Sequence, residues 1–316
     1  MFMKQTIPNP SSTVSRVLAF AMALAVTAHV DAVENRKTFA TPEAAVAALT
    51  SAVMTTNRAE LHAIFGPAAH KIENPDAVQA ANEFATFASA LNEKQRLVRE
   101  PGRFVLELGE DYWPFPVPIM QKDGQWYFNT EQGVDELLNR RIGGNELETL
   151  NFMRTYVQAQ RDYASRDRNG DEVLQYAQKI ISTPGTKDGL FWSPDMDGEI
   201  SPLGPLAADA ADEGYKRGEQ NPEKRPQPFH GYCFKILTRQ GKHAPGGKHG
   251  YIINGRMIDG FALVAWPAQY GNSGIMTFIV NQQGRIYQRD LGPTTAKAAE
   301  AIKAYDPDNT WLLSAD

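Results

Sequence analysis

Residues 261–266 read Phe-Ala-Leu-Val-Ala-Trp, an apolar run that ends at Pro267. In a strand, successive side chains point to opposite faces, so the odd-numbered residues face one side and the even-numbered residues the other. A run that is apolar at every position must be covered on both faces. It therefore predicts a buried central strand with a layer of structure on each side.

The segment 145–164 supplies a candidate cover for one face. Its apolar or uncharged residues recur every three or four positions, which is helical spacing over about five turns. We expect Leu150, Met153 and Val157 to pack against the strand, and a loop or the N-terminal part to cover its other face. The full stripe is Leu147, Leu150, Met153, Val157, Gln160 and Ala164.

The rest of the C-terminal half is rich in strand patterns. Residues 231–238 and 275–280 read as strands, and the turn 281–284 leads into a return strand at 285–288. Residues 294–304 predict a closing helix that Pro307 ends.

The middle of the chain predicts helices and loops. Residues 134–141 and 145–164 are expected as two helices that Gly143 and Gly144 separate. Further along, helical fragments are expected at 173–181 and 205–211 within a stretch rich in proline and glycine.

The N-terminal third predicts helices followed by a hairpin. Thr41 before Pro42 is typical of a helix start, and residues 38–65 read as two helices, with another at 76–90. Residues 122–125 form a predicted turn before a return strand at 126–128.

These patterns predict an α+β fold. N-terminal helices plus a β-hairpin precede a long amphipathic helix packed on an antiparallel sheet. The expected boundaries are a signal peptide at 1–32, a small α+β domain at 33–132, and a helix-plus-sheet domain at 133–316.

The start of the chain has the pattern of a secretory signal. Lys4 and Arg16 precede an apolar run at 17–28, and the small residues Val30 and Ala32 follow it. The run is shorter than the roughly 20 residues that span a membrane. We expect export to the periplasm or the outside of the cell, with cleavage after Ala32 and no transmembrane span in the remainder.

The composition of the chain limits the kinds of molecule that it is expected to bind. The net charge of −5 over 316 residues argues against nucleic-acid binding, which favours a basic surface. A protein partner in the cell envelope is expected. The chain has one cysteine, so no disulfide can form within it.

Two groups of residues have metal-ligand chemistry. Residues 167–171 resemble the start of a calcium loop, but the second half of the loop lacks the expected glycine and glutamate. Imidazole and thiolate groups suit zinc or copper, although the spacing of the second group matches no standard site. A helix-ending turn and a solvated loop are the favoured interpretations, so no cofactor is predicted. The candidate ligands are Asp167, Asn169 and Asp171, and separately His230, Cys233, His243 and His249.

One acidic cluster is compatible with hydrolysis of a glycan or peptide. Its carboxylates lie beside Phe191 and Trp192, and paired carboxylates cleave glycosidic bonds. A polar surface loop has the same composition and is favoured. The candidate catalytic residues are Asp188, Asp195, Asp197 and Glu199.

Seven segments together are similar to one bacterial family. They are 140–147 (RRIGGNEL), 155–160 (TYVQAQ), 184–190 (PGTKDGL), 201–206 (SPLGPL), 231–237 (GYCFKIL), 260–267 (GFALVAWP) and 277–281 (TFIVN). They resemble the domain-of-unknown-function 2950 family from about Phe39 to the C-terminus. The resemblance implies an export signal and no particular activity.

A weaker resemblance concerns the order of elements in the C-terminal half. A long helix, a loop, Gly-Tyr-x-Phe and a hairpin are similar to the heads of bacterial pseudopilins. We expect a non-catalytic binding or scaffolding protein of the cell envelope. The alternatives are a periplasmic hydrolase that uses carboxylates in 188–199 and a metal-handling protein.

Overall fold

The computed structural model describes residues 36–168, 170–193, 198–215 and 228–314. The predicted signal at 1–32 lies outside these residues, as do Asn169, Asp195 and Asp197. The chain from Asn35 onward groups as one unit, and its buried apolar side chains form two separate cores.

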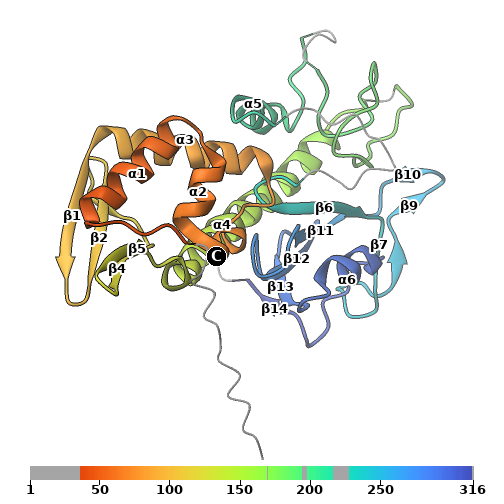
Figure 1. Ribbon diagram of the computed structural model, residues 1–316. Helices are drawn as coiled ribbons and strands as arrows, with labels where there is room; N and C mark the ends of the chain where they lie inside the picture. Colours follow the sequence, from red (N-terminus) through yellow and green to blue (C-terminus); the bar gives the residue numbers. More distant parts are fainter. Residues whose placement is uncertain (1–35, 169, 194–197, 216–227, 315–316) are drawn as a thin grey trace, which may run out of the picture. The chain divides into compact units, whose positions relative to one another are not determined.

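Strand β11 (Ala262–Pro267) is an interior strand of the C-terminal sheet, one place from its edge, and every one of its residues is buried. It pairs antiparallel with β6 (Tyr232–Leu237) on one side and with β12 (Met276–Asn281) on the other. Beyond β12 follow β13 (Tyr287–Asp290) and the edge strand β14 (Leu312–Leu313), also antiparallel (Figure 1). The prediction of a buried strand with a neighbour on each side is confirmed.

Helix α4 (Thr130–Tyr163) covers one face of this sheet. The ring of Phe152 lies 4.2 Å from that of Phe234, and the ring of Tyr156 lies 5.7 Å from that of Phe261. The predicted contact residues Leu150, Met153 and Val157 are all buried, whereas Leu147 of the same stripe is 64% exposed.

The other face of the sheet carries α6 (Thr295–Ala301). Lys235 of β6 donates from Nζ to the carbonyl oxygens of Ala299 (3.1 Å) and Glu300 (2.7 Å) at the end of this helix. Val264 pairs with Lys235 across the sheet and therefore faces α6. The expectation that a loop or the N-terminal part covers this face is wrong, because the predicted closing helix folds back onto it.

The N-terminal part encloses the second core between helices and an antiparallel sheet. The sheet runs β1-β2-β4-β5, with β3 paired to β2. Thr41 caps α1 as predicted, since its Oγ1 accepts from the N–H of Ala44 at 3.1 Å. The elements are α1 (Pro42–Met54), α2 (Arg58–Phe65), the 3₁₀ helix η1 (Gly66–Lys71), α3 (Ala77–Glu93), β1 (Gln95–Glu100), β2 (Arg103–Leu108), β3 (Trp113–Pro114), β4 (Ile119–Lys122) and β5 (Gln125–Phe128).

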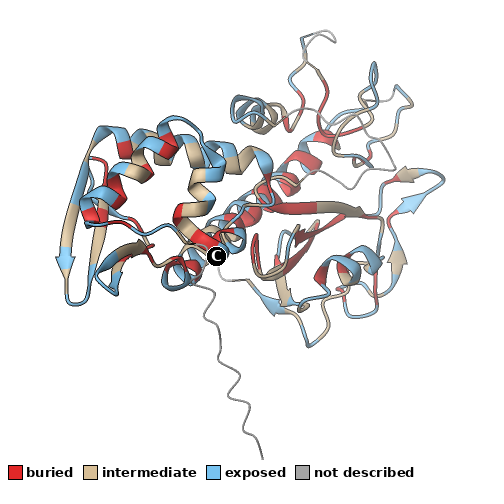
Figure 2. Cartoon of the chain, viewed as in Figure 1, coloured by how far each residue is buried: buried red, intermediate tan, exposed pale blue. Residues whose placement is uncertain are grey.

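Helix α4 runs without interruption through Gly143 and Gly144, so the predicted break there is wrong. A glycine inside a helix costs about 1 kcal/mol relative to alanine, which tertiary contacts can outweigh. Such contacts exist on both sides of the pair, because the side chains of Arg141 and Asn145 bond to other elements. The helix contributes buried residues to both halves of the chain (Figure 2).

Residues 173–181 are irregular, so the predicted helical fragment there is wrong. The buried side chain of Gln160 donates to the carbonyl of Ala177 and accepts from its N–H, both at 2.9 Å. Tyr176 donates its N–H to the carbonyl of Met257. These bonds engage backbone groups that a helix would pair internally.

The remaining elements are short. Helix α5 (Gly204–Asp212) confirms the fragment predicted at 205–211. Two small antiparallel pairs follow β6, namely β7 (Arg239–Gln240) with β8 (His249–Gly250), and β9 (Ile252–Ile253) with β10 (Arg256–Met257). In the described ranges, no helix combines the length and apolar character that crossing a membrane requires.

Candidate functional site

Asp188, the first residue of the predicted acidic cluster, anchors a turn. Its oxygens accept from Lys179 Nζ (2.6 Å), from the Thr183 N–H (2.7 Å) and from the hydroxyls of Thr183 and Thr186. Burial by itself raises the pKa of this carboxyl, but the hydrogen bonds from Lys179 and Thr183 outweigh it and hold the pKa well below its usual range. Such a group stays ionised and suits a structural role better than proton transfer.

Glu199, the other described carboxylate of the cluster, lies among cations. Lys187 approaches it at 2.6 Å and Arg168 at 3.5 Å. The Arg168 side chain is nearly buried, and its guanidinium lies over the rings of Tyr163 and Trp192. Through Arg168, these contacts hold Trp192 and Glu199 against the C-terminal end of α4. The hydrolase interpretation stays a prediction, because Asp195 and Asp197 lie outside the described residues.

The predicted calcium-loop residues bind backbone amides. Asp167 accepts from the N–H groups of Gly170 (2.9 Å) and Glu172 (2.7 Å). Asp171 accepts from Val173, and its other oxygen lies 3.0 Å from Arg256 Nε. These bonds are typical of a turn that follows a helix.

The three predicted histidine ligands face three different carboxylates. His230 lies 3.1 Å from Glu213, His243 lies 3.1 Å from Asp306, and His249 lies 3.5 Å from Asp259. Within the described part of the chain, no group of three or more His, Cys, Asp or Glu side chains could hold a metal ion.

Cys233 is buried in β6, and burial raises the pKa of its thiol to about 11. The negative charges of Glu300 and Asp76 act in the same direction. A thiol of this kind is a poor nucleophile at neutral pH, because the thiolate is the reactive form.

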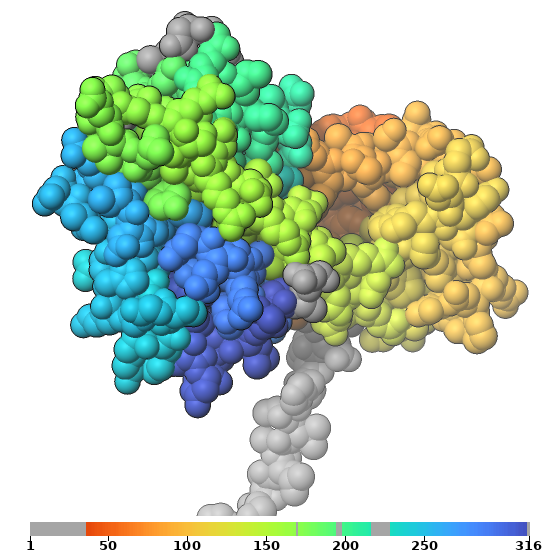
Figure 3. All heavy atoms as spheres, turned by 180° about the vertical axis from the view of Figure 1, so that it is seen from behind, coloured from red at the N-terminus to blue at the C-terminus, as the bar shows by residue number. Residues whose placement is uncertain are grey.

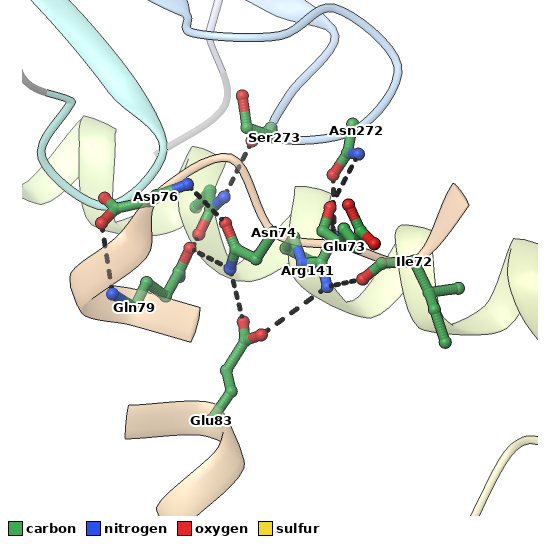
Figure 4. Close-up of polar contacts among 10 residues, drawn as sticks. Ile72, Glu73, Asn74, Asp76, Gln79, Glu83, Arg141, Asn272 and Ser273 are labelled. Atoms are coloured by element: carbon green, nitrogen blue, oxygen red, sulfur yellow. Dashed lines mark hydrogen bonds and ion pairs between the residues drawn. The ribbon is translucent and has the colours of Figure 1, made fainter. Parts of the chain in front are cut away.

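A polar junction joins the N-terminal helices, through α4, to the loop between β11 and β12 (Figure 4). Arg141 of α4, whose side chain is 9% exposed, donates to the carbonyl of Ile72 and to Asn272 Oδ1, both at 2.7 Å. It also lies 3.6 Å from Glu83, and Asn272 Nδ2 donates to the carbonyl of Glu73 at 3.0 Å. One guanidinium thus connects residues from both parts of the chain.

Two further side chains complete the junction. Asn145, one turn after Arg141, donates to the carbonyl of Ser273 at 2.9 Å and accepts from Gln79 at 2.6 Å. Asp76 is 1% exposed, caps α3, and accepts from the Tyr215 hydroxyl and the Gly231 N–H. Paired buried groups of this kind fix the packing of elements, so the junction has a structural role.

A shallow, open groove lies between α6 and the β12–β13 pair. Its volume is about 340 Å³, at the small end of the range for ligand sites. Two cations lie along it, Arg289 and Lys303. The apolar lining consists of Ile279, Leu291, Ala298, Ile302, Ala304 and Trp311.

The lining of the groove carries two cations and one carboxylate. Its one carboxylate, Asp306, accepts from both the backbone N–H and the ring of His243. Nearby Asp308 is held by Thr310, whose hydroxyl and N–H lower the pKa of the carboxyl, with Arg289 adding to the effect. Lys303 makes a long contact, 3.4 Å, to the backbone carbonyl of Glu300. An apolar group that carries a negative charge fits these surroundings.

Sequence reasoning missed both the junction and the groove. Gly143 and Gly144 interrupt a strong helix pattern and therefore mark an unusual place in the chain. The neighbouring sequence does not specify which residues Arg141 contacts. The groove combines residues from β12, β13, α6 and the segment before β14, and no motif spacing connects them.

One family model, described as protein of unknown function (DUF2950), matches residues 36–313. Neither the curated proteins nor the solved structures include a match to this chain. The similarity to pseudopilin heads is therefore unsupported.

Proposed function

Because the chain belongs to the DUF2950 family, whose description names no activity, we propose from its own features that it is an exported, non-catalytic binding protein of the cell envelope. Export rests on the basic start, the apolar run at 17–28 and the small residues before position 33. Binding rests on the groove beside α6.

The groove suits a segment of a partner protein that carries an apolar side chain next to an acidic one. Its apolar lining takes the first, and Arg289 and Lys303 attract the second. Opposite charges across an interface speed association and select the partner. The partner is expected among envelope proteins, the compartment that the signal predicts.

The edge of the sheet extends this surface. β14 is the last strand on its side of the C-terminal sheet, and Leu313 pairs with Tyr287. Paired residues share a face, so Leu313 and Trp311 lie on the same side as the groove. Leu312 and Leu313 are 66% and 60% exposed. An extended segment that adds to a sheet edge gains main-chain hydrogen bonds there and specificity from side-chain pockets.

Co-purification from the native envelope tests the proposal. The double variant Arg289→Glu plus Lys303→Glu reverses the charge of the groove and is expected to lose a partner that the wild type retains. Lys297→Glu is the matched control, since Lys297 is an exposed lysine of α6 that does not line the groove. Equal recovery with all three proteins contradicts the role of the groove.

Fractionation tests the localisation separately. The full-length protein is expected in the periplasmic or external fraction with residues 1–32 removed. Retention in the cytoplasm with an intact N-terminus contradicts export.

A further inference from the structure

The segment from Arg239 to Ile258 differs in charge from the rest of the chain. It contains Arg239, Lys242, Lys248 and Arg256 and no acidic residue, within a protein of net charge −5. Arg256 pairs with Asp171, and the other three basic side chains are exposed. The segment's own exposed charged side chains are therefore positive, and the carboxylates that contact its histidines are Asp306 at His243 and Asp259 at His249.

The same segment presents apolar side chains to solvent. Ile252 and Ile253 form β9 and are 38% and 44% exposed. Ile258 directly follows β10 and is 41% exposed. The turn Asn254–Gly255 joins the two strands, and both of its residues have positive φ, as a tight hairpin turn requires. The hairpin stands out from the sheet beside it at the edge of the view (Figure 1), and the segment lies at the surface of the space-filling view (Figure 3).

The base of the hairpin is firmly held. Tyr251 is buried and its hydroxyl donates to Gln240 Oε1 at 3.0 Å. Gln240 is 1% exposed and donates from Nε2 to the carbonyls of Pro245 (2.6 Å) and Gly247 (2.8 Å). The carbonyl of Met257 accepts from the Tyr176 N–H at 2.8 Å. The isoleucines are thus carried on an ordered support, and presenting them requires no rearrangement.

We propose that the β9–β10 hairpin docks the protein on an anionic phospholipid surface. Isoleucine side chains enter the boundary between headgroups and acyl chains, while Arg239, Lys242 and Lys248 lie near the lipid phosphates. The negative charge of the remaining chain matters less, because electrostatic effects fall off within about 8 Å at physiological ionic strength. This surface is independent of the groove beside α6.

Vesicle co-sedimentation of the purified chain without its signal residues tests this. We expect at least tenfold stronger binding to vesicles that contain phosphatidylglycerol than to vesicles of phosphatidylcholine alone. Binding should fall several-fold in 0.5 M NaCl, as screening of surface charge predicts. Equal binding to both vesicle types, or none to either, overturns the proposal.

Paired variants locate the contact. Ile252→Ser plus Ile253→Ser is expected to weaken vesicle binding at least tenfold, and Lys242→Gln plus Lys248→Gln several-fold. Leu312→Ser plus Leu313→Ser is the matched control, an apolar pair on β14 that is more exposed than the hairpin pair. An unchanged urea midpoint shows that a variant is folded. If the control weakens binding as much as the hairpin variant does, the hairpin is not the docking element.

Discussion

Arg141→Met tests whether the polar junction holds the two cores together. Methionine keeps much of the apolar stem but removes the two 2.7 Å bonds to Ile72 and Asn272 and leaves Glu83 without this cation. Each hydrogen bond from a charged group contributes about 1.5–3 kcal/mol. The Glu83 contact adds little, because that carboxylate is 43% exposed. We therefore expect about 3–5 kcal/mol of destabilisation, a large share of the roughly 5–15 kcal/mol typical of a folded protein.

Arg140→Met is the matched control. Arg140 is the neighbouring residue on α4, its side chain is 40% exposed, and it pairs with Glu136 one turn earlier at 2.6 Å. Exposed pairs of this kind contribute about 0.3–0.5 kcal/mol. Urea unfolding followed by tryptophan fluorescence measures both variants. If Arg141→Met costs less than about 1 kcal/mol, or no more than the control, the junction does not stabilise the fold as argued.

Three further predictions concern the core, the acidic turn and the cysteine. Leu263→Ala, in the fully buried strand β11, should cost about 2–5 kcal/mol in urea unfolding, and an unchanged midpoint contradicts a buried β11. Asp188→Asn should destabilise the protein at pH 7, because a lowered pKa stabilises the folded state above the ordinary value of 3.8. That difference should shrink as pH falls through the lowered pKa, and a pH-independent difference refutes the argument. Cys233 should resist iodoacetamide at pH 8 in the native protein and react readily in urea, since burial raises its pKa to about 11, and rapid native labelling contradicts this.

Sequence patterns predicted the elements whose local signals agree with their tertiary surroundings. The run at 261–266 is apolar at every position and buried at every position. Phe261 immediately precedes β11, and the rest of the run lies in the strand. Thr41 and Asp76 cap α1 and α3, whose starts were expected within one residue.

The errors occurred where distant residues decided the local structure. Gly143 and Gly144 indicate a helix end locally, but Arg141 and Asn145 are held from outside the helix and α4 continues. The fragment at 173–181 has a helical pattern, yet the Gln160 side chain takes both backbone groups of Ala177. No local pattern contains these contacts.

The candidate site was predictable only in its parts. The hairpin at 275–288 and the closing helix near 294–304 were both expected, and they form two walls of the groove. Their packing brings Arg289 toward Lys303, which the sequence does not specify. Conversely, the histidines that are close in sequence face separate carboxylates.

Site-specific photo-crosslinking in intact cells tests the central claim, that a partner protein of the envelope binds at the groove. One benzophenone side chain is placed at position 313, on the groove face of β14. The control is placed at position 147, on the surface of α4 and away from the groove. The natural leucines at these positions are 60% and 64% exposed. We predict a discrete adduct from position 313 that disappears with Arg289→Glu plus Lys303→Glu, and no such adduct from position 147. Equal adducts from both positions, or an adduct at 313 that survives the charge reversal, would contradict the account.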